Sequence, residues 1–250
     1  MRRKGPPRKT VAIIGYGRFG RLAARYLQAD FRVLVCDTSR RLRTARGVKR
    51  VALEAAARTP FIILAVPIGR LRPLLVEMAP FVPRGALVID VCSVKEEPIR
   101  WMKELLPRHT GILGTHPLFG PDSADRSLEG KTIALCAARV SRSRLRHVER
   151  YLKERGLHVA RMKAREHDAL MAKSLFLTQY LGHALLRLNL PSAEKTTSNY
   201  RRLSEIARTT GHDTLELLRD MYRYNRYAWR MPPLFSRTLK SLSLELTRRR

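Results

Sequence analysis

The sequence predicts an α/β protein in which a doubly wound, mostly parallel sheet is followed by a small all-helical domain. Three observations indicate this fold. Short apolar runs alternate with helical segments up to residue 162, a glycine-rich turn separates the first strand from the first helix, and only helical patterns follow residue 162. Strands that alternate with helices favour a parallel sheet with helices on both faces.

Three segments divide the chain. Residues 1–9 form a basic arm, residues 10–162 the sheet domain and residues 163–250 the helical domain, and a length of 250 residues suits this division. The arm leads directly into a strand, without the apolar segment and cleavage site of a secretory signal. No apolar run approaches the roughly 18 residues of a membrane-spanning helix. We therefore expect a cytoplasmic protein that has no membrane partner.

The formal net charge of +29 is unusual, and the 50 lysines and arginines are spread along the whole chain. No nucleic-acid motif and no basic strip with interleaved aromatic residues accompanies them, so we expect no specific nucleic-acid partner. The charge would still attract small anions. The three cysteines, Cys36, Cys92 and Cys136, lack the spacing of a metal site or a redox pair. We expect reduced, buried thiols and no metal.

The strands of the sheet are expected where apolar, β-branched residues cluster, because a strand buried on both faces is apolar throughout. These runs are 10–14, 32–36, 61–66, 86–91 and 132–137, with an edge strand at 157–160 and a short run at 111–113. Helical spacing of apolar residues predicts helices at 21–28, 71–78, 96–106 and 142–155.

The helical domain is predicted from a change of period. Residues 167–190 carry a broad apolar face without a break, and shorter helical stretches follow at 201–209, 214–230 and 239–247, separated by Gly211 and Pro232-Pro233. A domain of about 85 residues has a marginal core when it stands alone. The apolar face of the long helix is therefore interpreted as core and as the interface of a homodimer.

A glycine motif, Gly15-Tyr-Gly17-Arg18-Phe19-Gly20, follows the first strand and opens the first helix. In this context the first glycine makes the tight turn, the second lets the backbone approach a pyrophosphate, and the third lets helix pack on strand. The helix N-terminus offers free N–H groups to phosphates. The segment predicts a Rossmann-type dinucleotide site that includes Arg18 and Phe19.

Asp37 ends the second strand, 22 residues after Gly15, where an acidic side chain binds the ribose hydroxyls of NAD. Thr38 and Ser39 complete this part of the predicted cofactor site. Arg40 or Arg41 could instead hold a 2′-phosphate, so NAD is favoured and NADP is possible. Alternatively, Asp37 only caps a turn with Thr38 and Ser39.

Ser93 and His116 are the candidate catalytic residues. Ser93 follows the fourth strand, and Pro117 is expected to place His116 in a stiff loop at the end of the next strand. A neutral imidazole can accept the proton of an alcohol while a hydride leaves its carbon, and a serine can orient the same hydroxyl. Otherwise Ser93 is a helix N-cap and His116 an ordinary polar contact. A hydrolase pair is disfavoured because no Gly-x-Ser-x-Gly elbow surrounds Ser93.

The sequence resembles the prephenate and arogenate dehydrogenases of tyrosine biosynthesis from Val11 to about Ala228. Besides the glycine motif, the resemblance rests on five elements: Ala65-Val66-Pro67, Asp90-x-x-Ser93-Val94-Lys95, Thr115-His116-Pro117-x-Phe119-Gly120-Pro121, Glu166-His167-Asp168 and Tyr200-Arg201. The Ser-Val-Lys and His-Pro-x-Phe-Gly-Pro elements, in this order, are far more specific than the glycine motif.

The resemblance implies a Rossmann domain and a helical dimerisation domain, with the active site between them. It implies oxidation of the ring C4 alcohol of prephenate or arogenate, transfer of hydride to NAD or NADP, and loss of the ring carboxylate as carbon dioxide. His116 would accept the hydroxyl proton and Ser93 would bind the same hydroxyl. Arg201 would pair with a substrate carboxylate, with Arg202 as the alternative.

The resemblance also implies that Ala65, Val66 and Pro67 contact the cofactor and that Lys95 and Thr115 contact the substrate. On the long helix many relatives have a second histidine near the substrate, and this sequence has Gln179 there. Glutamine can still donate a hydrogen bond, but it is uncharged at every pH.

Two other functions remain open from the residues. The chain could be another dehydrogenase built from a Rossmann domain and helices that acts on a small hydroxyacid or imine. It could also be a catalytically silent NAD-binding protein whose basic surface binds anionic partners, and that binding would weaken steeply with salt.

Overall fold

The computed structural model describes residues 8–39, 43–188 and 190–248. The chain divides into two compact units, Met1–Ala164 and Arg165–Arg250, which we call the sheet unit and the helical unit. Most of the predicted basic arm, residues 1–7, lies outside the described residues, as do Arg40 and Arg41.

An eight-stranded sheet forms the centre of the sheet unit, in the order β3-β2-β1-β4-β5-β6-β7-β8. Neighbouring strands are parallel except β6 and β7, which are antiparallel. The strands are β1 (Thr10–Ile14), β2 (Arg32–Cys36), β3 (Val48–Arg50), β4 (Phe61–Leu64), β5 (Leu87–Asp90), β6 (Gly111–Pro117), β7 (Thr132–Arg139) and β8 (His158–Arg161). The predicted doubly wound, mostly parallel sheet is confirmed.

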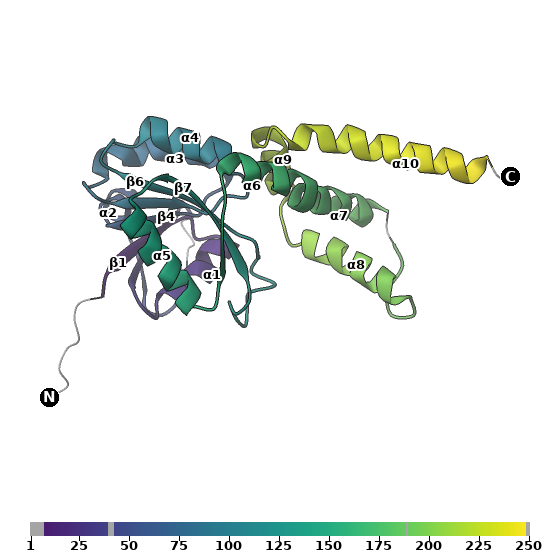
Figure 1. Ribbon diagram of the computed structural model, residues 1–250. Helices are drawn as coiled ribbons and strands as arrows, with labels where there is room; N and C mark the ends of the chain where they lie inside the picture. The colour runs from purple at the N-terminus through teal and green to yellow at the C-terminus, as the bar shows by residue number, and fades with distance from the viewer. Residues whose placement is uncertain (1–7, 40–42, 189, 249–250) are drawn as a thin grey trace. The chain divides into compact units, whose positions relative to one another are not determined.

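Helices cover both faces of this sheet. They are α1 (Arg18–Leu27), α2 (Leu53–Ala57), α3 (Ile68–Met78), α4 (Glu96–Leu105) and α5 (Arg142–Glu154). Right-handed crossovers place α1 on one face and α3 and α4 on the other. Because β7 runs against β6, the crossover through α5 returns to the face of α1. Figure 1 shows α3 and α4 side by side, and α5 on the other side of the sheet.

The structure differs from the sequence prediction at His116. Strand β6 does not end at residue 113; it continues through His116, which lies opposite Ala134 of β7, to Pro117. The prediction that His116 lies in a loop is therefore wrong. Proline is tolerated here because it is the last residue of the strand, where its missing N–H interrupts no further ladder bond. Strand β3 and helix α2 were not predicted.

The helical unit contains helices of different lengths and two single helical turns. They are α6 (Ala164–Met171), a π-helical turn (Ala172–Phe176), α7 (Leu177–Arg187), α8 (Ser198–Thr210), α9 (Leu215–Tyr224), a 3₁₀ turn (Ala228–Arg230) and α10 (Met231–Thr247). The hydroxyls of Thr197 and Thr214 cap α8 and α9 by accepting backbone N–H bonds. The predicted long helix contains the π-helical turn. Pro232 and Pro233 open α10 rather than precede it, because proline fits the first helical turn.

None of the three cysteines forms a disulfide bond, and Cys92 and Cys136 are buried. Among the described residues, no three histidine, cysteine or acidic side chains are grouped so that they could hold a metal ion. None of the helices in the described ranges has the length and apolar character needed to cross a membrane.

Candidate active site

The candidate site residues of the sheet unit follow four adjacent strands. Strands β1, β4, β5 and β6 are neighbours and run parallel, so their carboxyl ends lie at one edge of the sheet. The glycine turn follows β1, the Ala65–Pro67 segment follows β4, and Ser93 follows β5. His116 lies near the end of β6. In open α/β sheets this edge is where ligands bind.

The glycine turn depends on close backbone approaches. Gly15 has a φ of +96°, and a side chain there would collide with the carbonyl of Ala65. A side chain at Gly20 would collide with the carbonyl of Gly15, whereas at Gly17 no atom of the described residues, its chain neighbours and helix backbone aside, lies within 4 Å of the Cβ position. The turn is therefore tightly packed on its inner side and open at Gly17, where a bulky anion can approach the backbone.

Helix α1 begins directly after this opening. Its N-cap is Gly17, no side chain caps the helix, and its first turn contains no acidic residue. The N-terminus of this helix is therefore a position where backbone N–H groups can bind an anion. Phe19 is half-buried, and Arg18 is exposed and pairs with Asp122 at 2.7 Å. Sequence reasoning missed Asp122, which lies 104 residues away along the chain.

Asp37 is bonded to the glycine turn itself. One carboxylate oxygen accepts the N–H of Tyr16 at 2.7 Å, and the other accepts the N–H of Ser39 at 2.8 Å. The turn-capping alternative is therefore present, and the carboxylate also lies against the predicted cofactor segment. Arg50 donates to the carbonyl of Ser39 at 2.9 Å. It brings a cation to this position from β3, a strand that was not predicted.

A buried network joins the ends of β5 and β6. Lys95 has no exposed surface, and its ammonium pairs with Asp90 and donates to the carbonyl of Thr115 at 2.6 Å. The hydroxyl of Thr115 donates to the carbonyl of Asp90 at 2.7 Å. Burial raises the pKa of Asp90, and the adjacent ammonium opposes this rise.

This network changes the interpretation of Lys95 and Thr115, which were predicted to contact a substrate. The ammonium of Lys95 is enclosed by the protein, and the hydroxyl of Thr115 is bonded to backbone. Both residues hold the turn after β5 against β6, one residue before His116. In the sequence, the signal for this network was Asp90, an acidic residue at the end of an apolar run. A carboxylate buried there needs a partner, and Lys95 is that partner.

Ser93 and His116 lie next to this buried network in the sequence, since Ser93 is between Asp90 and Lys95 and His116 follows Thr115. The hydroxyl oxygen of Ser93 is buried and has no hydrogen-bond partner among the described residues. His116 is 7% exposed. Side chains alternate along a strand, so His116 lies on the face of β6 opposite to Thr115 and Pro117. That these two side chains meet at one substrate hydroxyl stays a prediction.

Gln179 and Arg201 belong to the helical unit. Gln179 of α7 is buried, and its amide nitrogen donates to Asp213 at 2.8 Å, while its amide oxygen is buried without a partner in the part of the chain that the structure describes. Arg201 of α8 is exposed and donates to the carbonyl of Thr196 at 3.3 Å. It lines a hollow of about 430 Å³. Arg202, the alternative, is also exposed.

Comparisons with known proteins identify the sheet unit. The family model described as the nucleotide-binding domain of prephenate dehydrogenase matches residues 25–161, more than half of the chain. A second model, described as a TYRAAT1-like C-terminal domain, matches residues 184–250.

Individual relatives agree with the first model. Chloroplastic arogenate dehydrogenase 2 of Arabidopsis thaliana is 30% identical over 168 residues, which cover 65% of this chain and 47% of the relative. Arogenate dehydrogenase 1 of the same plant is 28% identical over 88% of this chain and 36% of its own length. The chain thus spans about half, or less, of these curated relatives.

A solved structure shows the same fold. The prephenate dehydrogenase from A. aeolicus, in complex with hydroxyphenyl propionate and NAD+, superposes with a TM-score of 0.75 at 19% identity, and the match covers 98% of this chain and 93% of that one. Because the family model matches more than half of the chain, the chain belongs to the prephenate dehydrogenase family.

Proposed function

We propose that this protein oxidatively decarboxylates prephenate or arogenate with NAD, or with NADP, as the hydride acceptor. The observation that carries the proposal is the buried hydroxyl of Ser93, which has no protein partner and follows β5 at the edge that also holds the glycine turn. A buried hydroxyl without a hydrogen-bond partner lowers the stability of the fold unless a ligand supplies the missing hydrogen bond. The hydroxyl of a bound substrate would do so.

The sheet unit fits a nicotinamide dinucleotide. Gly17 leaves space for the pyrophosphate, the uncapped N-terminus of α1 faces that space, and Asp37 lies at the distance along the chain where the ribose is bound. Thr38, Ser39 and the Ala65–Pro67 segment would complete the contacts. When bound, the nicotinamide supplies the acceptor for the hydride.

In this reaction the side chains of the protein transfer one proton and hold the substrate ring in position. His116 takes the proton of the C4 hydroxyl as the hydride leaves C4, and Ser93 binds the same oxygen. The electron pair of the carboxylate bond then enters the ring, carbon dioxide departs, and His116 returns the proton to the oxygen of the new phenol. The Asp90–Lys95–Thr115 network keeps β6 in register while this happens.

The helical unit would supply the remaining substrate contacts and the dimer interface. Arg201 would pair with a substrate carboxylate, and Gln179 would take the place of the histidine of many relatives. The two-copy assembly is supported by leucines of α10 that remain about half exposed, among them Leu239 and Leu242. We place the enzyme in the cytoplasm, as the sequence suggests.

The test is an absorbance assay for reduced nicotinamide, run with prephenate and arogenate against NAD and NADP. His116→Asn should lower turnover at least about a hundredfold, the typical contribution of a general base, and leave cofactor affinity nearly unchanged. His158→Asn is the matched control, since His158 is exposed on β8. Normal turnover of His116→Asn would remove this residue from the reaction. Cofactor binding without turnover of either substrate would contradict the proposal.

A further inference from the structure

The two faces of the central strands are covered unequally. On β4, Ile62 and Leu64 are fully buried on one face, whereas Phe61 and Ile63 on the other face are only half-buried. On β5, Val88 is fully buried on the first face, and on the second face Leu87 is fully buried whereas Ile89 is half-buried. Parallel sheets normally have both faces covered, so the apolar sequence of β4 and β5 implies an occupant on the second face.

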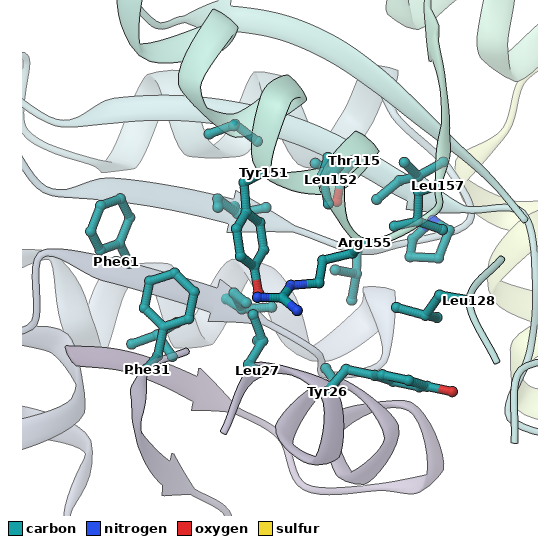
Figure 2. Close-up of a pocket in the computed structure, with 18 of the residues that line it drawn as sticks. Tyr26, Leu27, Phe31, Phe61, Thr115, Leu128, Tyr151, Leu152, Arg155 and Leu157 are labelled. Atoms are coloured by element: carbon teal, nitrogen blue, oxygen red, sulfur yellow. The ribbon is translucent and has the colours of Figure 1, made fainter. Parts of the chain in front are cut away.

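A cavity of about 720 Å³ lies on this second face. Its floor is the sheet, and its walls are residues of α1 and α5, such as Leu27 and Leu152 (Figure 2). The volume falls in the range of about 300–1,000 Å³ that is typical of small-molecule sites. The cavity belongs entirely to the sheet unit.

Aromatic rings give one end of the cavity a fixed shape. Phe31 packs edge-to-face against Phe61, with ring centroids 6.3 Å apart, and against Tyr151, at 5.4 Å. Tyr151 is held in place because its hydroxyl donates to Asp30 at 2.9 Å. The rings therefore form a preformed apolar wall, which suits the hydrophobic body of a ligand.

The rim of the cavity is basic. Lys9, Arg144, His147 and Arg150 line it, whereas Glu154 is the acidic residue among its lining. Arg144 is half-buried, with its guanidinium 5.5 Å from the centre of the Phe61 ring and one N–H donated to the carbonyl of Gly85 at 2.6 Å. Burial lowers the pKa of Arg144, so an anion placed beside it would relieve an electrostatic cost.

From this geometry we propose that the cavity binds an amphipathic carboxylate, with its apolar body on the β4–β5 surface and its anionic head at Arg144. The charge of the rim argues against the apolar helix of a second copy: α10, the described helix with the most exposed leucines, carries Arg237 and Lys240 and would bring further positive charge. A neutral apolar ligand would fill the cavity but would bring no negative charge to the half-buried guanidinium of Arg144.

The cavity lies on a face of the sheet and touches the elements that carry the candidate site. Phe19 of the first turn of α1 lines it, as do Thr115 and Pro117, which flank His116 on the opposite face of β6. A ligand in the cavity would therefore contact Phe19 of the predicted cofactor site and the two residues that flank His116, from the face of β6 opposite to His116. The proposal does not rest on the proposed dehydrogenase function, because its ligand occupies another surface.

Decanoate, at concentrations below micelle formation, is the probe, and isothermal titration calorimetry of the full chain is the measurement. We expect saturable binding, and 1-decanol should bind more weakly because it lacks the charge. Arg144→Gln should weaken decanoate binding about tenfold and leave 1-decanol unchanged, since charge-assisted hydrogen bonds are the strong ones. Arg146→Gln, an exposed arginine of the same helix outside the cavity, is the matched control and should bind decanoate normally.

Filling the cavity gives an independent test. Ala23→Leu on α1 should weaken decanoate and 1-decanol alike, whereas Ala29→Leu, at an exposed position just after α1, should not. Melting temperatures verify folding, and Ala23→Met is the milder variant if Ala23→Leu unfolds. Equal decanoate affinity of Arg144→Gln and the unaltered protein would overturn the proposal. Competition between decanoate and NAD would also overturn it, and so would loss of a dimer in Ala23→Leu.

Discussion

The sheet unit and the helical unit bury their apolar residues to very different degrees. In the sheet unit Ile13, Leu64 and Met102 have no exposed surface. In the helical unit α10 has no buried residue at all, and Leu242 and Leu246 are 51% and 69% exposed. The sheet unit therefore buries most of its own core, except at the cavity between α1 and α5, whereas α10 presents an apolar surface that another surface could cover.

Buried ionisable groups occur in both units, and in the helical unit His167 and Asp168 are buried with their side chains 2.7 Å apart. The sheet unit contains a fully buried ion pair, Lys95 with Asp90, at the centre of its candidate site. Such a pair can be kept only where the surrounding packing is complete, because an unpaired buried charge is expensive. Substitutions in the sheet unit should therefore change the free energy of unfolding, and substitutions on α10 should change association.

The largest effect is expected for Lys95→Ala. It leaves the buried carboxylate of Asp90 without its partner and should lower the free energy of unfolding by about 3–5 kcal/mol, measured by urea denaturation. Lys103→Ala, at an exposed position of α4, is the control and should stay within about 0.5 kcal/mol. The double variant Asp90→Ala with Lys95→Ala should cost less than the sum of the single variants. Additive costs would mean that the two groups do not interact.

Ile62→Ala should come next. Ile62 is fully buried on β4 on the covered face of the sheet, so its truncation removes apolar contact and leaves a hole. The free energy of unfolding should fall by about 2–5 kcal/mol in the same measurement. A cost below about 1 kcal/mol would show that the sheet core repacks easily, and would weaken the contrast with α10.

A smaller, pH-dependent effect is expected at the surface of the sheet unit. Arg161 of β8 donates to Glu149 of α5, and this hydrogen bond lowers the pKa of the Glu149 carboxyl. The pair therefore stabilises the fold above the ordinary glutamate pKa of about 4.3, and this contribution is lost as the pH falls through the lowered value. Arg161→Gln should be less stable than the unaltered protein at neutral pH, and the difference should vanish in acid. A difference that stays constant across this range would assign it to packing.

The smallest effect on stability is expected for Leu242→Ser. Because Leu242 is half exposed, the free energy of unfolding of the single chain should change by less than about 0.5 kcal/mol. If α10 forms the proposed dimer interface, the same variant should shift the monomer–dimer equilibrium towards monomer in analytical ultracentrifugation. Unchanged association of Leu242→Ser would place the interface elsewhere, and a large loss of stability would mean that α10 belongs to a closed core.

The sequence was most informative where one local rule decides the structure. The glycine motif predicted the turn between β1 and α1, since its spacing has a steric meaning that needs no tertiary contact. His116 was placed in a loop because the effect of Pro117 was weighed without the antiparallel strand β7, which begins 15 residues later. Strand β3 has only three residues, two of them charged, which is too short for a periodic signal.

The buried network and the partners of Gln179 depend on tertiary structure. Lys95 was assigned to the substrate from the family resemblance, and because a lysine is rarely buried, nothing local in the sequence indicated its buried pair with Asp90. Asp213, which accepts the hydrogen bond of Gln179, lies 34 residues further along the chain. Nothing in the local pattern joins these positions. Pro232 and Pro233 were interpreted as a break, although proline also opens helices, and only the path of the chain distinguishes the two cases.

The π-helical turn at Ala172–Phe176 determines which side chains before and after it point to the same side of the helix. Twelve residues of regular α-helix would rotate Gln179 by about 120° from His167, at about 100° per residue. A π-bulge contains about one extra residue, so the remaining eleven steps leave the two side chains only about 20° apart. Both are indeed buried. Deleting a single residue from this turn should therefore convert it to regular α-helix and keep Gln179 nearly in line with His167, because eleven regular steps give the same rotation of about 20°.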